Sequence, residues 1–270
     1  RKGGGERSSK NNLYMIHRAK KSLGQNFLKS ISALNKIVAA GELFPRDMVL
    51  EIGPGKGALT EKLLEKAGQV IAIEKDKVLF EFLSEKFKEE IKNKKLILRE
   101  DDILEFDASQ FKKFKIIANI PYNITGAILK KFLTAENQPE MMVLMVQNEV
   151  AKRIVARDGR ESLLSISVKA YGEPKIIEKV PARYFSPAPK VDSAVIAIKN
   201  ISRKVFTENK IDESKFWEII RLGFAHKRKK LTSNLKSFKK NTAKHVWDDL
   251  GNKRAEELTL SDWIKLILLL

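Results

Sequence analysis

The stretch MVLEIGPGKGALTEKLLEKAGQVIAIEKD, residues 48–76, decides the fold class of this chain. It begins with an apolar run, turns through three glycines, continues with apolar residues at three- and four-residue spacing, and ends with a second apolar run. Short, nearly continuous apolar runs are typical of parallel strands covered on both faces, and the spacing between them predicts an amphipathic helix. The stretch therefore predicts a strand–helix–strand unit.

The same alternation continues to about residue 150. A second helical pattern, KVLFEFLSEKFKEEI (77–91), follows Asp76, which we expect to cap its N-terminus. Strand–helix alternation indicates a doubly wound α/β sheet of the Rossmann-like type. The further strand-like runs are KLILRE (95–100), KIIANI (115–120) and MMVLMVQ (141–147).

The pattern changes in the second half of the chain. ESLLSISVKAYG (161–172) is helical, PKIIEKV (174–180) is extended, and SAVIAIK (193–199) alternates like a final strand. From about residue 201 only helical patterns follow. We therefore predict an α/β unit over residues 15–200 and a small, basic, all-helical unit over 201–270. Residues 1–14 are expected to be an extension outside the fold, disordered or added to the natural protein.

Composition excludes several classes of protein. The chain has 270 residues, of which 43% are hydrophobic and 32% charged, as in globular proteins. It has no Cys, which excludes disulfides, thiolate zinc sites and a Cys nucleophile. With only three His, we expect no metal site. No apolar stretch reaches the length of a membrane span, so we expect no membrane partner and a cytoplasmic, bacterial-type location, with an organelle left open.

The net charge of +18 points to a polyanionic partner. Residues 1–30 contain eight Lys or Arg and one acid, and residues 199–244 contain fourteen and four. Two basic zones beside a balanced core indicate nucleic acid. An anionic membrane surface is the alternative, weakened by the lack of a basic amphipathic anchor.

A glycine-rich turn and an acidic strand end indicate an adenosine-containing cofactor. Gly53, Gly55 and Gly57 follow the first strand, where a tight turn and a close ligand require glycine. Glu74 ends the second strand, about 20 residues on, where a carboxylate accepts hydrogen bonds from ribose hydroxyls. Asp102 follows the third strand and can hold an adenine amino group, although a solvated acidic turn is the alternative. A dinucleotide and S-adenosylmethionine both fit these features.

The fourth strand ends in Asn-Ile-Pro-Tyr, which favours S-adenosylmethionine and methyl transfer to an exocyclic amine. Asn119 Oδ1 and the Ile120 carbonyl can hold the two N–H groups of an adenine amine and aim its lone pair. Pro121 fixes the turn that presents this carbonyl. Tyr122 can stack on a flipped-out base. An ordinary strand-end turn is the alternative.

Taken together, six motifs closely resemble those of the KsgA-type small-subunit rRNA adenine dimethyltransferases. The likeness runs from about residue 19 to 200, with a further match at GFAHKRKKLTSNL (223–235). The motifs are KKSLGQNFL (20–28), LEIGPGKGALT (50–60), IAIEKD (71–76), NIPYNIT (119–125), MVQNEVAKRI (145–154) and FSPAPKVDSAVI (185–196).

The resemblance implies a methyltransferase fold with seven strands, one of them antiparallel, and a helical C-terminal domain. It implies S-adenosylmethionine-dependent dimethylation of two adjacent adenines in a hairpin loop near the 3′ end of small-subunit rRNA. It also implies roles for single residues: Asn26 and Leu28 as a lid over the cofactor, Gly53 with Gly55 at its methionine part, Glu74 at the ribose, Asp102 at the adenine, Asn119 where cofactor and target meet, and Phe185 as a second aromatic wall for the target base.

Two basic segments are expected to contact RNA phosphates. They are Lys20 with Lys21, and Lys227, Arg228, Lys229 and Lys230. A charge run is often only a solvated face, but this one matches the rRNA-contacting segment implied by the resemblance. The expected partner is small-subunit rRNA within an immature small ribosomal subunit, bound by a monomer.

Other functions compete with this interpretation. The related large-subunit rRNA methyltransferases of the macrolide-resistance type share the central motifs, but the segments 185–195 and 225–235 resemble the small-subunit branch. A non-catalytic assembly or transcription factor is a second alternative, disfavoured by the intact glycine turn, Glu74 and NIPY. DNA adenine methyltransferases usually carry two prolines at this strand end.

Overall fold

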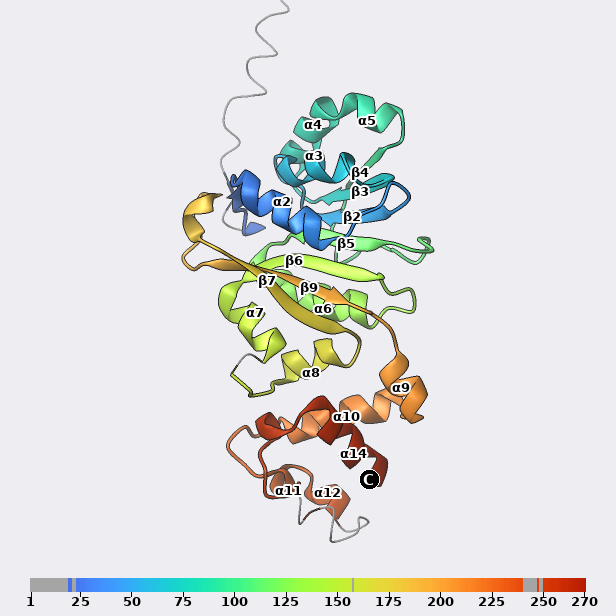
Figure 1. The fold of residues 1–270 in the computed structure, drawn as a ribbon, viewed down its shortest axis with the longest axis vertical. Helices are drawn as coiled ribbons and strands as arrows, with labels where there is room; N and C mark the ends of the chain where they lie inside the picture. The colour runs from blue at the N-terminus through green and yellow to red at the C-terminus, as the bar shows by residue number, and fades with distance from the viewer. Residues whose placement is uncertain (1–18, 21–22, 157, 240–246, 248–249) are drawn as a thin grey trace, which may run out of the picture.

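A computed structural model describes residues 19–20, 23–156, 158–239, 247 and 250–270 (Figure 1). It confirms the predicted sheet of seven mostly parallel strands, in the order β4-β3-β2-β5-β6-β9-β7. The predicted strand positions are correct to within one residue at most ends. The strands are β2 (Met48–Ile52), β3 (Gln69–Glu74), β4 (Leu96–Glu100), β5 (Lys115–Asn119), β6 (Met141–Gln147), β7 (Glu173–Val180) and β9 (Ser193–Lys199).

The strand order places four strand ends side by side. β4, β3, β2, β5 and β6 pair in parallel, and β9 runs antiparallel to both of its neighbours. The order reverses between β2 and β5, because β3 and β4 lie on one side of β2 and the later strands on the other. In open α/β sheets, ligands bind outside the carboxyl ends of the strands at such a reversal.

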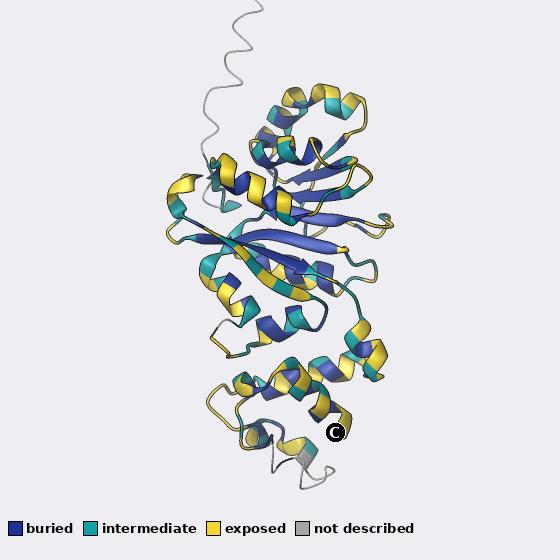
Figure 2. Ribbon diagram, viewed as in Figure 1, coloured by how far each residue is buried: buried dark blue, intermediate teal, exposed yellow. Residues whose placement is uncertain are grey.

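Helices cover both faces of the sheet (Figure 1). Consecutive strand residues therefore enter different cores: Leu50 packs in one and Val49 in the other. Figure 2 shows the central strands as buried, as their continuous apolar runs require. The helices α2 (Ile31–Ala40), α3 (Ala58–Leu64), α4 (Lys77–Lys86) and α5 (Lys88–Lys92) pack on one side, and α6 (Thr125–Leu133), α7 (Asn148–Val155) and α8 (Leu163–Lys169) on the other.

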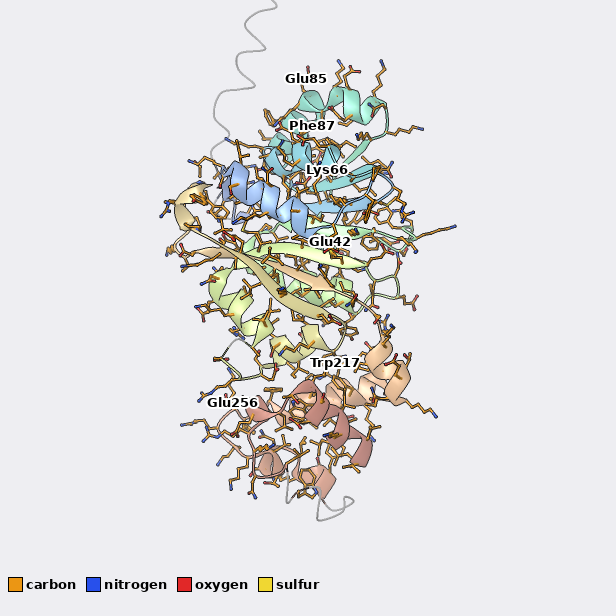
Figure 3. The ribbon with its side chains drawn as sticks, viewed as in Figure 1. Glu42, Lys66, Glu85, Phe87, Trp217 and Glu256 are labelled. Carbon is orange, nitrogen blue, oxygen red and sulfur yellow. The ribbon has the colours of Figure 1, made fainter. Side chains whose placement is uncertain are left out.

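The second predicted helix is interrupted at Phe87. Asp76 caps it as expected, since its carboxylate accepts a hydrogen bond from Val78 N at 3.1 Å. The backbone leaves the helical conformation at Phe87 (φ −109°, ψ 30°), and its ring, labelled in Figure 3, packs under the glycine turn. A Cβ on Gly57 would lie 2.5 Å from that ring, so the contact requires glycine there.

Helices alone follow β9 in the described part of the chain, and they lie beyond one end of the α/β layers (Figure 1). Gly223 lets α10 and α14 approach closely, because a Cβ there would overlap the Trp263 ring. The division at residue 200 stays a prediction, and residues 1–14 lie outside the described residues. These helices are α9 (Lys204–Asn209), α10 (Glu213–Gly223), α11 (Leu231–Asn234), α12 (Lys236–Lys239), η4 (Ala255–Glu257) and α14 (Leu260–Leu269).

Arg203 connects these helices to the end of α6. Its Nε atom donates to Glu213 at the start of α10, at 3.0 Å. Its two terminal nitrogens donate to the carbonyls of Ala135 (2.8 Å) and Thr134 (2.7 Å), just past the end of α6. These bonds satisfy carbonyl groups that a helix end leaves without partners inside the helix.

Tyr171 extends the same junction. Its hydroxyl donates to the other oxygen of Glu213 at 2.5 Å and accepts from the indole N–H of Trp217 at 3.0 Å. The Tyr171 and Trp217 rings stack with centroids 6.0 Å apart, and Figure 3 marks Trp217 at this junction. Burial and the hydrogen bond to the Glu213 carboxylate raise the pKa of Tyr171, so its hydroxyl remains a donor.

A second, two-stranded sheet forms from segments far apart in the chain. β1 (Phe27–Leu28) pairs antiparallel with β8 (Phe185–Ser186), and η3 (Ala182–Tyr184) precedes β8. This pairing carries the N-terminal segment across the carboxyl edge of the main sheet. Among the described residues, no helix is long and apolar enough to cross a membrane.

Candidate active site

A cavity of about 800 Å³ opens at the carboxyl ends of β2, β3, β4 and β5. Its walls come from the N-terminal segment, the glycine turn and the three following strand ends. Such a volume suits a ligand of cofactor size. The residues expected from the sequence that line it are Asn26, Leu28, Gly53, Gly55, Glu74, Asp102, Asn119, Ile120, Pro121 and Tyr122.

The glycine turn forms the floor of the cavity. Gly53 and Gly55 have φ values of +63° and +62°, in the left-handed region that favours glycine. At Gly55 an added Cβ would lie 3.0 Å from the Phe27 ring, so a larger residue would disturb the N-terminal segment. The turn therefore keeps bare backbone facing the cavity.

Glu74 is buried beside this turn. Its two oxygens accept hydrogen bonds from Gly55 N (3.1 Å) and Asp76 N (2.9 Å). Burial raises the pKa of Glu74 above its ordinary value, and these backbone donors oppose the rise. Each carboxylate oxygen has a second lone pair, so Glu74 can still accept hydrogen bonds from a ligand hydroxyl.

Asp102 lies at the next strand end and is held by a lysine. Its oxygens accept from Lys75 Nζ at 2.6 Å and from Leu104 N at 2.9 Å. The hydrogen bond from Lys75 lowers the pKa of Asp102, so the group is ionised. An ionised acceptor at this point can hold the amino group of an adenine ring.

The amide of Asn119 has a defined orientation. Its Nδ2 donates to the carbonyl of Asn26 at 3.1 Å. Because the amide nitrogen faces the N-terminal segment, Oδ1 is the atom that can accept a hydrogen bond from a substrate. Asn26 thereby links the predicted cofactor-binding segment to the predicted catalytic residue.

The other residues of the NIPY turn also have defined backbone and side-chain positions. Pro121 has φ −59° and ψ 130°, and Tyr122 begins the short helix η2 (Tyr122–Ile124) that leads into α6. The Tyr122 hydroxyl lies 2.6 Å from Ser193 Oγ on β9, and burial raises the pKa of Tyr122. The buried serine therefore fixes the direction of the ring. Ser193 was not expected from the sequence, where it is only a polar residue at the start of a strand.

Phe185 is a buried residue. It is 2% exposed, packs in the core under α2 and α3, and does not line the cavity. The β1–β8 pairing places Phe185 opposite Leu28, and the two side chains are buried in the same core. Its role as a second wall for a target base stays a prediction.

Lys20 is held by an ion pair. Its ammonium forms an ion pair with Asp76 at 2.8 Å, and Gln25 donates to the other Asp76 oxygen at 2.9 Å. Lys20 thus anchors the N-terminal segment, and its contact with an RNA phosphate stays a prediction. Lys21 lies outside the described residues. Lys227, Arg228, Lys229 and Lys230 are exposed between α10 and α11, as RNA contact requires.

Glu51 is a buried acid of the cavity that the sequence reasoning missed. It lies within β2, is 1% exposed, and lines the cavity below the glycine turn. Burial, reinforced by the charge of Glu74, raises the pKa of Glu51 to about 8. The signal in the sequence was a single acid inside an otherwise apolar strand. Among the described residues, no group of three His, Asp or Glu side chains could hold a metal ion.

The donor set of the cavity fits S-adenosylmethionine. Glu74 offers acceptors for a ribose, Asp102 an acceptor for an adenine amine, and the Gly53 turn an open stretch of backbone. Asn119, at the end of β5, lines the same cavity. The fold and site together define an S-adenosylmethionine-dependent methyltransferase.

Comparisons with known proteins identify the family of methyltransferases to which the chain belongs. The family described as ribosomal RNA adenine dimethylase matches residues 16–270. A protein of Dehalococcoides mccartyi strain CBDB1, named ribosomal RNA small subunit methyltransferase A, is 44% identical over 261 residues, covering 93% of this chain and 88% of that protein. The chain belongs to the ribosomal RNA adenine dimethylase family, and it is an S-adenosylmethionine-dependent enzyme.

Two solved structures share the fold over nearly the whole chain. A dimethyladenosine transferase from Plasmodium falciparum is 29% identical with a TM-score of 0.76, covering 89% of this chain and 95% of its own. The 23S rRNA methyltransferase ErmE is 26% identical with a TM-score of 0.76, covering 90% and 99%. The likeness includes the helices that follow the sheet, because the sheet region alone is too short to account for this coverage.

Proposed function

We propose that this enzyme dimethylates the N6 atoms of two adjacent adenines in a 3′-terminal hairpin loop of small-subunit rRNA. The observation that carries the proposal is the fixed amide of Asn119, whose Oδ1 faces a cavity suited to the cofactor. The 44% identity to a small subunit methyltransferase supports the choice of rRNA.

The residues of this chain contribute to the reaction by positioning the target adenine. Bound S-adenosylmethionine supplies the methyl group. Asn119 Oδ1 and the carbonyl of Ile120 accept the two N–H groups of the adenine amine, which turns the nitrogen lone pair toward that methyl group. Tyr122, held by Ser193, stacks on the flipped-out base. The methylated nitrogen loses its proton readily, so no ionised side chain is required as a base.

The proposal also covers the oligomeric state of the enzyme, the particle that it modifies and its location. We infer that the enzyme acts as a monomer on an immature small ribosomal subunit, in the cytoplasm where such subunits assemble. The exposed run from Lys227 to Lys230 supports contact with rRNA phosphates.

One assay tests this function. The full chain is incubated with labelled S-adenosylmethionine and, separately, with immature small subunits, mature small subunits and large subunits, and the labelled bases are mapped. We expect label on two neighbouring adenines of the small-subunit rRNA. Label on large-subunit rRNA would support the competing function suggested by the likeness to ErmE, and no label on any RNA would contradict catalysis.

A further inference from the structure

An exposed aromatic residue lies directly beside the buried Phe185. Tyr184 is 36% exposed, and the Arg183 guanidinium lies 5.4 Å from the centroid of its ring. Its carbonyl accepts a hydrogen bond from Lys29 N at 2.8 Å, and Lys29 lines the cavity. The backbone of Tyr184 is therefore bonded to a segment that lines the active-site cavity, although Tyr184 itself does not line it.

The chain segments next to Tyr184 carry three exposed cations. Lys29, Arg183 and Lys190 are all exposed on the two segments that the β1–β8 pairing brings together. The nearest acid in the loop, Asp192, is paired with Lys179 at 2.8 Å and accepts a hydrogen bond from Ala182 N at 3.0 Å. An aromatic ring among unbalanced cations is the usual composition of a site for single-stranded nucleic acid.

The position of this ring suits a neighbour of the target base. Asn26 holds Asn119 at the reaction point, and Lys29, which contacts Tyr184, follows three residues later. An extended chain rises about 3.3 Å per residue, so Asn26 and Lys29, which flank β1, are at most about 10 Å apart. A base next to a flipped-out adenine in the same unpaired strand can reach that point.

We propose that Tyr184 and Arg183 form a stacking site for an unpaired RNA base adjacent to the target adenine. The proposal rests on the function proposed above and adds a substrate contact to it. The Tyr184 ring stacks on the face of the base, and the guanidinium of Arg183 supplies a further cation–π contact and attracts the phosphate. Because every base has such a face, the contact holds the strand without selecting its sequence.

The experiment compares Tyr184→Ala, Tyr184→Phe and a matched control, each in the full chain. Phe44→Ala is the control, because Phe44 is also exposed and has Lys115 Nζ 5.7 Å from its ring centroid, but lies at the amino ends of β2 and β5. The substrate is a hairpin RNA of the small-subunit 3′ end with 2-aminopurine next to a target adenine. Methyl transfer, 2-aminopurine fluorescence, cofactor affinity and melting temperature are measured.

We expect Tyr184→Ala to raise the KM for RNA roughly five- to hundredfold, with kcat and cofactor affinity within about twofold of wild type. The quenching of 2-aminopurine on binding should be lost in this variant and kept in Tyr184→Phe and Phe44→Ala. An unchanged KM and unchanged quenching in Tyr184→Ala would overturn the stacking site. Absence of methyl transfer by the wild-type chain on every RNA would instead contradict the proposed function.

Discussion

Asn119 can serve the proposed reaction in only one of its two amide orientations. With Nδ2 toward the Asn26 carbonyl, Oδ1 is presented to the substrate; with the amide reversed, a donor would face the donors of the adenine amine. The backbone of the N-terminal segment thus sets the polarity of the catalytic group. An uncharged acceptor needs such support, which an ionised carboxylate would not.

Replacing this amide should separate chemistry from cofactor binding. We expect Asn119→Ala to lower kcat by at least a hundredfold, because the acceptor that places the amine is lost. Cofactor affinity should stay within a few fold, since the variant keeps Glu74 and Asp102. Single-turnover methyl transfer and cofactor titration check the two quantities. Normal turnover by the variant would contradict the mechanism.

Glu51 predicts a pH effect on stability. In the folded chain Glu51 keeps its proton up to about pH 8, whereas in the unfolded chain it releases it near its ordinary pKa of 4.5. The folded state therefore binds more protons between these values, and this group makes stability fall as pH rises. We expect wild type to lose about 2 kcal/mol more than Glu51→Gln between pH 6 and pH 8 in urea unfolding. Equal losses would show that Glu51 is ionised in the folded state.

The sequence predicted the site residues that follow strand ends, but not those whose positions depend on distant pairing. Glu74, Asp102 and Asn119 could be placed because the carboxyl ends of parallel strands meet at one edge. The burial of Phe185 depends on pairing with a strand about 160 residues earlier, for which the sequence carries no register signal. The ion pair of Lys20 with Asp76 depends on the same path of the N-terminal segment.

At the scale of elements, α4 is joined to the cofactor cavity through its cap. Asp76 caps α4 and also receives Gln25 and Lys20 from the segment that lines the cavity. The predicted strand bounds agree with the structure to within one residue at most ends, because buried strands have an unambiguous apolar pattern in the sequence. The break between α4 and α5 could not be predicted, because it arises where Phe87 packs under Gly57 rather than from local sequence.

Two helix caps provide a matched test of this connection. Asp212 caps α10 far along the chain, with its carboxylate accepting from Lys215 N at 2.7 Å. We expect Asp76→Ala and Asp212→Ala each to lower the free energy of unfolding by about 1 kcal/mol. Only Asp76→Ala should weaken cofactor binding, by about tenfold, because it also releases the Gln25 anchor. Isothermal titration and urea unfolding measure both effects; equal cofactor affinities in the two variants would refute the anchor.

At the scale of the whole molecule, the positive charge is expected to govern RNA binding. A protein that contacts six or more phosphates loses about a thousandfold or more in affinity between 50 and 200 mM salt. Replacing Lys227, Arg228, Lys229 and Lys230 with Gln should reduce the slope of log K against log salt by roughly 3. Fluorescence anisotropy with the hairpin RNA measures this slope.

The control for that prediction removes the same charge elsewhere. Lys88, Lys92, Lys94 and Lys95 are exposed on and after α5, at the opposite end of the molecule (Figure 1). Their replacement with Gln changes the net charge equally but should leave the salt slope nearly unchanged. If both sets reduce the slope by the same amount, net charge alone determines binding and the basic run between α10 and α11 is not a contact.

Because Arg203 forms hydrogen bonds at the end of α6, the length of that helix affects the position of the helices that follow β9. α6 begins at Thr125, directly after the NIPY turn, and its nine residues span about 13 Å before the carbonyls that Arg203 holds. The length of this helix, together with the contacts of Tyr171 with Glu213 and Trp217, therefore contributes to the separation between Asn119 and the helical unit. A chimera that exchanges residues 201–270 between relatives must keep both this length and the Arg203–Glu213 pair, since one added turn would displace the unit by about 5.4 Å.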